Sequence, residues 1–292
     1  MKKILALILA LSLLLCGCGK EDPVETTLAV PENTPSATDE NISSGEGEGI
    51  LDPETQLIYR LVKMIVTNDE GQELWGREYS YDDTGFCTWE REYSNIGSAA
   101  YSRVNSPDML GRIGSSLFTE LDGSQYTVFY TYDEFDRCLR EDLTREDGTK
   151  EYTEYTYNDQ GNYLTLKQYI GEELAVDYSF SYTYDGTGKL VSRDEYLGGE
   201  LLYHVTFTYD DQGRETGTVI ALINGEVQSR TESQWDGLTE TRYFYSGQDS
   251  EPYMVSVFTY DDAGNVVFEE TRQGDTVINR AEYIYEPFEV KK

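Results

Sequence analysis

The sequence predicts an all-β fold: an antiparallel meander of about 16 strands, built from ~25-residue hairpin repeats and curled into an open sheet. The main observation is a recurring motif, Tyr/Phe-Xaa-Tyr-Asp-Xaa-Xaa-Gly, in which alternating aromatic residues lead into a turn. Its second aromatic position falls at Tyr81, Tyr132, Tyr157, Tyr184, Tyr209, Trp235, Tyr260 and Tyr285. Because the gap from Tyr81 to Tyr132 is two periods long, we expect one degenerate unit between them.

The N-terminal residues predict an export signal. Two lysines precede an apolar run over residues 4–15, which is too short to span a bilayer as a helix. The run ends in Leu15-Cys16-Gly17-Cys18, which resembles the bacterial lipoprotein box. The resemblance implies a signal peptide over residues 1–17 and a lipid on Cys18. An ordinary secretory signal cut near Gly19 is the alternative.

Two further regions follow the signal. Residues 18–55 are acidic and rich in Pro, Ser, Thr and Glu, with almost no apolar periodicity. Such a segment buries too little surface to offset its chain entropy, so we expect a disordered tether. Residues 56–292 form the repeat domain. The sequence therefore predicts an extracytoplasmic protein anchored to a bacterial membrane through its N-terminal lipid.

The composition narrows the class of partners. The formal net charge is −32 at pH 7, and a surface this negative repels nucleic acid. Such a surface attracts divalent cations or cationic partners, but a solvated acidic exterior is the better explanation of the charge. We expect no nucleic-acid partner.

One unit illustrates the predicted hairpin. Over residues 176–184 aromatic and branched residues alternate with polar ones, which is typical of a strand with one apolar face. Asp185-Gly186-Thr187-Gly188-Lys189 follows, with Asp to open a turn and Gly188 to supply a positive φ. A second strand is expected from about Leu190 to Tyr196. Asp and Gly recur at the corresponding turns of most other units.

The fullest copies of the motif resemble a known repeat. They read FTYDDQGR at residues 207–214 and FTYDDAGN at residues 258–265. This pattern resembles the YD repeats of the RHS family of bacterial surface and toxin proteins, over roughly residues 75–290. The resemblance implies a curled, meandering β-sheet. The chain has no autocleaving core segment and no toxin domain like those of the family, so the toxin-enclosing role does not carry over.

The pattern weakens in two places. Residues 93–117 lack the aromatic alternation, and we expect an irregular stretch or a loop there. The unit of Trp235 has a shortened turn, and residues 246–252 form a longer connection. Irregular loops on a regular scaffold often carry binding residues, but repeats also decay there without penalty. Both interpretations stay open.

The repeated aromatic face is the candidate ligand site. A row of exposed rings could stack on sugar rings, whereas buried rings would be the core of a curled sheet. The tentative ligand-binding residues are Tyr155, Tyr157, Tyr182, Tyr184, Phe207, Tyr209, Phe258 and Tyr260. Calcium at the Asp turns is a weaker alternative, because one turn offers two carboxylates and calcium takes six to eight oxygens.

Nothing in the sequence indicates catalysis, a metal centre or a cofactor. His204 is the one histidine, and we expect it to be solvated or paired across strands. Cys87 and Cys138 occupy the same slot two periods apart. Two strands per period would separate them by about 19 Å, too far for a disulfide. An inward apolar slot is the expected role of both.

The sequence supports three functional hypotheses. The first is a non-enzymatic, lipid-anchored scaffold that binds an envelope polysaccharide or protein. The second is an envelope enzyme acting on polysaccharide, with acidic residues near residues 93–117 as its catalyst; two carboxylates in a pocket would favour it. The third is a structural spacer that exposes sheet edges, against which Glu282, Glu286 and Pro287 in the last strand argue mildly.

Overall fold

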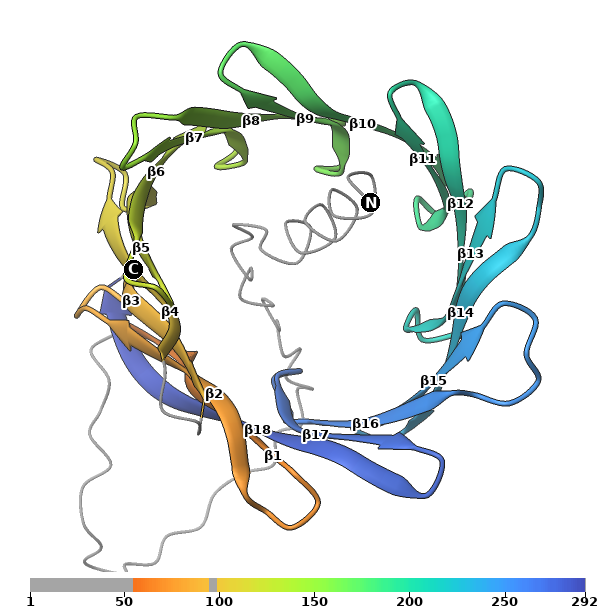
Figure 1. The fold of residues 1–292 in the computed structure, drawn as a ribbon. Coiled ribbons are helices and arrows are strands. Elements are labelled where there is room, and N and C mark those ends of the chain that lie inside the picture. Colours follow the sequence, from red (N-terminus) through yellow and green to blue (C-terminus); the bar gives the residue numbers. More distant parts are fainter. Residues whose placement is uncertain (1–54, 95–98, 292) are drawn as a thin grey trace, which may run out of the picture.

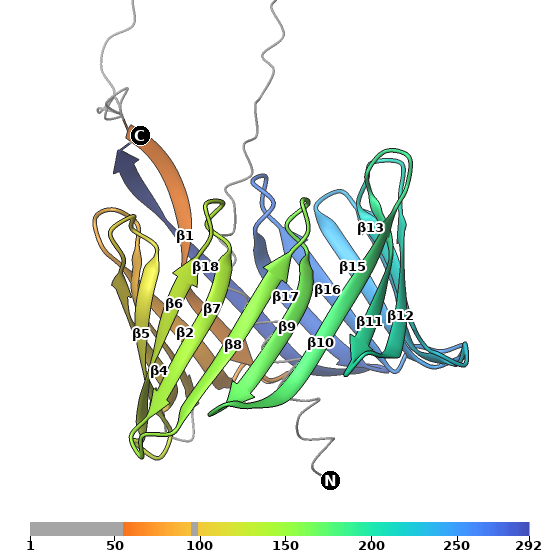
Figure 2. The ribbon, with the colours of Figure 1, turned by 90° about the horizontal axis from the view of Figure 1, so that it is seen from above.

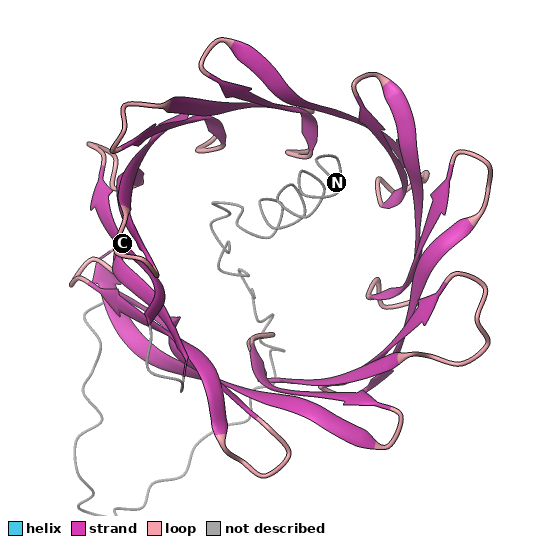
Figure 3. Ribbon diagram, viewed as in Figure 1, coloured by secondary structure: helices cyan, strands magenta, loops and turns pink. Residues whose placement is uncertain are grey.

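The structure, a computed structural model, describes residues 55–94 and 99–291. These residues form eighteen antiparallel strands and no helix (Figure 3). The strands are β1 (Thr55–Thr67), β2 (Glu73–Tyr81), β3 (Cys87–Ser94), β4 (Ala99–Pro107), β5 (Ile113–Glu120), β6 (Gln125–Tyr132), β7 (Cys138–Arg145), β8 (Lys150–Tyr157), β9 (Tyr163–Ile170), β10 (Glu173–Tyr184), β11 (Leu190–Leu197), β12 (Glu200–Tyr209), β13 (Glu215–Leu222), β14 (Val227–Asp236), β15 (Thr239–Ser246), β16 (Met254–Tyr260), β17 (Val266–Gln273) and β18 (Thr276–Lys291). The predicted signal peptide and nearly all of the tether lie outside the described residues.

The sheet is closed. Each strand pairs with its neighbours in sequence, and β1 pairs with both β2 and β18 (Figure 1). The all-β antiparallel prediction is confirmed, but the predicted open sheet of about 16 strands was wrong. Within the described part of the chain every strand has a partner on both sides. The sheet edges that the spacer hypothesis required are therefore absent from that part.

One reason for the wrong strand count lies in residues 93–117, which we expected to be irregular. Residues 95–98 are outside the described residues, but β4 and β5 form a regular hairpin on either side of Asp108–Arg112. The amide of Asp108 donates to the carbonyl of Arg112 at 2.7 Å. The turn after Tyr184 has the same bond, from Asp185 to Lys189 at 2.9 Å. The degenerate unit thus keeps its turn and loses only its aromatic residues.

The sheet closes because one repeat is divided between the two ends of the described chain. The unit of Tyr285 on β18 has no return strand after it, and β1 takes that place, with Leu61 opposite Tyr285. The hydroxyl of Tyr81 donates to the carbonyl of Leu61 at 2.8 Å, as Tyr132 does to Ile113 two units further on. Leu61 therefore occupies the position that opens a return strand, and the last repeat is closed by the N-terminal strand.

The aromatic face of the sheet points into the barrel. The amide of Gly198 donates to the carbonyl of Asp177, so the backbone groups of Tyr178 face β9 instead of β11. For L-residues, a side chain that points at the viewer on an upward strand has its backbone groups to its right. Figure 2 shows β10 running upward from outside, with β9 to its left. The side chain of Tyr178 thus points away from the viewer, into the lumen.

Burial agrees with this orientation. Side chains on the inner side of a closed barrel converge, so the inner face should be the more crowded one. Of the buried side chains in the described residues, all but Tyr245 share the face of Tyr178. The largest buried cluster is Cys138, Tyr155, Leu166, Tyr178 and Phe180. A second cluster at the closure joins Met64, Val66 and Ala281.

The barrel has two different rims. The Asp turns follow the even-numbered strands and therefore share one rim, where β1 also begins and β18 ends (Figure 2). The shortened turn after Asp236 and the longer connection between β15 and β16 are as expected. Eighteen strands spaced about 4.8 Å apart give a backbone ring at least ~27 Å across. Barrels of this strand number are wide enough to leave a channel inside their side chains.

Candidate functional site

The tentative ligand-binding aromatics all lie on the inner wall of the barrel. They come from β8, β10, β12 and β16, and they are Tyr155, Tyr157, Tyr182, Tyr184, Phe207, Tyr209, Phe258 and Tyr260. Tyr155 is buried, with 7% of its surface exposed, and the others are half-buried or nearly so. The face is therefore neither a sealed core nor a free platform, because the rings cover one another and still border the lumen.

Many of the tyrosine hydroxyls are held by the backbone. In five units a tyrosine donates to the carbonyl of the residue that opens the preceding return strand. The pairs are Tyr81–Leu61, Tyr132–Ile113, Tyr157–Cys138, Tyr182–Tyr163 and Tyr285–Val266. Burial raises the pKa of Tyr182 to about 12. These rings serve first as struts between strands, and only their faces remain for a ligand.

A second contact links each turn to the next unit. The residue after the turn glycine is often cationic, and it lies over the aromatic ring of the following unit. Arg112 lies 4.5 Å from the centroid of Tyr132, and Lys189 lies 4.6 Å from that of Tyr209. Arg112 also pairs with Asp108 of its own turn. Rings near this rim are thus covered by cations, which strengthens the rim but occupies those ring faces.

The degenerate unit interrupts this regular wall. Asn105 and Pro107 occupy the two positions that hold aromatics in other units. The side-chain amide of Asn105 donates to the carbonyl of Cys87 at 2.9 Å, where a tyrosine hydroxyl would otherwise bind. Asn105 in turn accepts a hydrogen bond from Ser116 at 2.7 Å. The polar contact is therefore replaced, but the ring is not.

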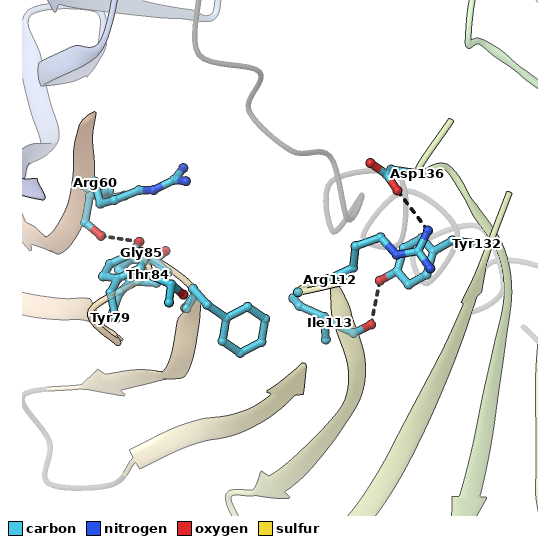
Figure 4. A pocket seen from close by; sticks show the side chains of 13 residues that line it. Arg60, Tyr79, Thr84, Gly85, Arg112, Ile113, Tyr132 and Asp136 are labelled. Atoms are coloured by element: carbon cyan, nitrogen blue, oxygen red, sulfur yellow. Dashed lines mark hydrogen bonds and ion pairs between the residues drawn. The ribbon is translucent and has the colours of Figure 1, made fainter. Parts of the chain in front are cut away.

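A hollow of about 480 Å³ lies in the inner wall between the β2–β3 turn and the β4–β5 turn, within the usual range for ligand pockets. Its lining combines aromatic, apolar and cationic side chains. They include Tyr79, Tyr81, Tyr132, Phe86, Leu61, Ile113, Cys87, Arg60 and Arg112. Figure 4 shows Arg60 and Tyr79 on one side and Arg112, Tyr132 and Asp136 on the other. This site was not predicted from the sequence. The turn at Asp108–Arg112 lies one period from the turns before and after it. That spacing could have identified a complete unit lacking its aromatic residues.

The hollow does not offer the arrangement that the enzyme hypothesis required. Asp136 is the one carboxylate among the described residues that line it, and Asp136 pairs with Arg112 at 2.9 Å. Hydrolysis of glycosides ordinarily takes two carboxyl groups about 5–10 Å apart. The lining of the hollow therefore suits binding better than this chemistry.

The acidic side chains of the inner wall are built into the structure. Glu240 is almost fully buried, at 1% exposure. It accepts hydrogen bonds from Ser233 at 2.6 Å and Tyr260 at 2.8 Å, and it pairs with Arg242 at 2.9 Å. A buried carboxylate with this many donors is satisfied where it stands. It strengthens the wall and leaves little acceptor capacity for a ligand.

The Asp turns are explained by turn chemistry. Oδ1 of Asp185 accepts hydrogen bonds from the amides of Thr187 and Lys189 at 2.8 and 3.0 Å. Hydrogen bonds from the side chain of Thr187 and from these amides hold its pKa below the ordinary value. Among the described residues no group of three or more His, Cys, Asp or Glu side chains could hold a metal ion.

The remaining sequence candidates lie apart from the hollow or belong to the wall. His204 is on the outer face, with Nδ1 2.5 Å from Asp194 on the neighbouring strand, so the cross-strand pairing we expected is confirmed. Cys87 and Cys138 are free thiols on β3 and β7. Both belong to the inner slot that opens a return strand, as the sequence predicted. Cys138 is buried and Cys87 is half-buried.

No family model matches the chain, and no curated protein matches it. Among solved structures, TcdB2-TccC3 without its hypervariable C-terminal region is 13% identical over 75% of this chain and 15% of that one, with a TM-score of 0.33. This chain spans about 15% of its length.

Porin-like proteins also resemble the barrel. That of Bacteroides uniformis is 12% identical over 77% of this chain and 98% of its own, with a TM-score of 0.29. That of Bacteroides vulgatus has the same identity and coverage and a TM-score of 0.23. At TM-scores this low we take no function, ligand or location from any of these proteins. Within the described residues, no helix is long and apolar enough to span a membrane.

Proposed function

We propose that this protein is a non-enzymatic, lipid-anchored extracytoplasmic binding barrel that holds a neutral envelope glycan against its inner wall. The observation that carries the proposal is the inward direction of the aromatic repeats. Half-buried rings such as Tyr182 and Phe207 line a closed barrel of eighteen strands, a strand number that leaves a channel. Half-buried ring faces next to polar groups are suited to sugar rings, which have apolar faces and hydroxyl edges.

Charge favours a neutral ligand over an anionic one. The chain carries 55 acidic and 23 basic residues, so an anionic polymer meets long-range repulsion. The cationic side chains of the inner wall are largely paired with carboxylates, as in Arg77–Glu92 and Arg103–Glu90. The lipid box at Cys18 and the predicted tether support location at a membrane surface.

Removal of inner ring faces tests the proposal. Phe207 and Phe258 are half-buried on the inner face and carry no hydroxyl strut. The double variant Phe207→Ala/Phe258→Ala should bind neutral oligosaccharides roughly tenfold more weakly for each ring, since one stacked ring contributes up to about 1.5 kcal/mol. Isothermal titration with hexasaccharides of glucose, mannose and N-acetylglucosamine measures the effect.

Phe129→Ala is the matched control. Phe129 is a phenylalanine on the outer face, with 54% of its surface exposed, and its loss should leave affinity unchanged. Wild-type protein that binds none of these glycans would contradict the proposal, as would equal affinities of the double variant and the control. Capture of a polypeptide in place of a glycan would contradict it too.

A further inference from the structure

The hollow in the inner wall is a missing ring of the repeat. In the flanking units the ring of Tyr81 or Tyr132 occupies this position of the inner wall. Its hydroxyl donates a hydrogen bond to a backbone carbonyl of the preceding strand. The equivalent residue on β4 is Pro107. Because Asn105 already bonds to the carbonyl of Cys87, the missing ring leaves no unpaired acceptor there. A space of about 480 Å³ lies between the turns on either side, with Phe86 and Ile113 in its lining.

The neighbours of this space are suited to a ring. In several other turns the residue after the glycine is a cation lying over the next aromatic, as with Arg112 over Tyr132. In the turn before the hollow that residue is Phe86, which lines the space. A ring placed there would therefore meet an apolar aromatic face, where rings such as Tyr132 and Tyr209 meet a cation. The other apolar walls are Leu61 and Ile113.

One polar group of the hollow lacks a partner. Nε of Arg60 is buried and has no hydrogen-bond acceptor in the structure, whereas Arg112 is paired with both Asp108 and Asp136. A buried donor without an acceptor is costly, and a ligand oxygen would remove that cost. The hollow thus offers a ring-sized apolar space with a donor at its side.

We propose that this hollow is the subsite that grips one sugar ring of the bound glycan, with the ring on Phe86 and a hydroxyl accepting from Arg60. The inference rests on the proposed function and names where recognition occurs within it. The other aromatic units would then guide the polymer, and this unit would fix its position. The loss of the aromatic from one repeat is, on this view, what creates the binding site.

Restoring the repeat tests the proposal. Pro107→Tyr places the missing ring in the hollow, so it should lower affinity for the hexasaccharide by at least tenfold. The same variant should unfold at an equal or higher temperature, because the tyrosine fills space and adds a backbone donor that proline lacks. Ser106→Tyr is the matched control, since Ser106 is the adjacent residue of β4 and lies on the outer face. It should bind as wild type does.

A second variant keeps the test decisive if Pro107→Tyr fails to fold. Arg60→Gln removes the guanidinium without filling the space and should weaken binding several-fold. Wild-type affinity in a folded Pro107→Tyr or Arg60→Gln protein would overturn the subsite and leave the proposed function standing. Wild-type protein that binds no glycan would overturn both.

Discussion

The tyrosines of the motif contribute to the fold in two ways, through their rings and through their hydroxyls. The ring covers the inner wall, and the hydroxyl ties its strand to the one before, as in Tyr157 to the carbonyl of Cys138 at 2.6 Å. Phenylalanine would supply the ring without the tie. The sequence predicted one apolar face of the sheet, but the hydroxyl bonds leave no mark in an alternation pattern and could not be predicted from it.

Glu141 is a carboxyl of the inner wall whose pKa is changed mainly by burial. It lies on the inner face opposite Tyr130, and burial raises its pKa, an effect that a hydrogen bond from Tyr155 partly offsets. A carboxyl whose pKa is higher in the folded state stabilises the fold most below its unfolded pKa. That stability is lost as the pH rises through the folded pKa.

Glu141→Gln should therefore have nearly wild-type stability near pH 4 and greater stability than wild type near pH 8. Urea unfolding at both pH values measures this. Glu78→Gln is the opposite control: burial opposes ionisation of Glu78, but Arg91 and Lys63 hold its pKa below the ordinary value. Glu78→Gln should destabilise at pH 8 and lose that effect in acid. The same pH trend in both variants would refute the assignment.

The turn was the best-predicted element. Asp to open it and Gly to supply a positive φ were both expected, and Gly188 has a φ of +89°. Asp136 takes the same position with a φ of 61° and is the single described residue other than glycine with a positive φ. Its ion pair with Arg112 offsets part of the backbone cost. The strand β4, which ends at Pro107, could not be predicted from the sequence. Its unit contains a proline and lacks the aromatic residues by which the other units were recognised.

Gly186 and Gly188 lie in the same turn and together allow the energetic cost of a positive φ to be measured separately. A side chain at Gly188 or Gly186 would meet open space, but only Gly188 has a positive φ. Gly188→Ala should lower the free energy of unfolding by about 1–2 kcal/mol. Gly186→Ala should leave it unchanged or raise it by up to about 1 kcal/mol, since alanine restricts the unfolded chain. Chemical denaturation of both variants measures the difference, and equal effects would contradict it.

The whole molecule depends on the contact between its first and last strands. β1 and β18 are paired from Thr55–Lys291 to Thr67–Arg280, and Met64 and Val66 are buried there. The sequence predicted the repeat, the turn chemistry and the strand faces. It did not predict closure, because β1 carries no copy of the motif and its partner lies more than 200 residues away. The hollow was not predicted for a related reason. It depends on an aromatic residue that one unit lacks, and it can be recognised only when the positions of the flanking units are known.

Val66→Asp should open this contact. Val66 has 3% of its surface exposed, and an unpaired buried carboxylate costs several kcal/mol. Hydrogen–deuterium exchange should become faster in β1, β2 and β18, and should stay slow in β8–β11. Val104→Asp is the control, since Val104 is 47% exposed and on the outer face. Uniform acceleration around the barrel would show that closure is not a separable event.

For a chain exported from its N-terminus, as we propose, the division of the last repeat between β18 and β1 would set an order of events. β1 would then leave the membrane first, and its partner β18 would emerge after all the other described strands. Until β18 is present, β1 can pair only with β2. The free edge of β1 stays as one edge of the sheet, and each newly added strand forms the other edge. Joining them closes a loop of more than 200 residues, whose entropic cost grows only slowly with length but whose search is slow. A chain held by its N-terminus would keep that first strand in place at the surface while the remainder is delivered to it.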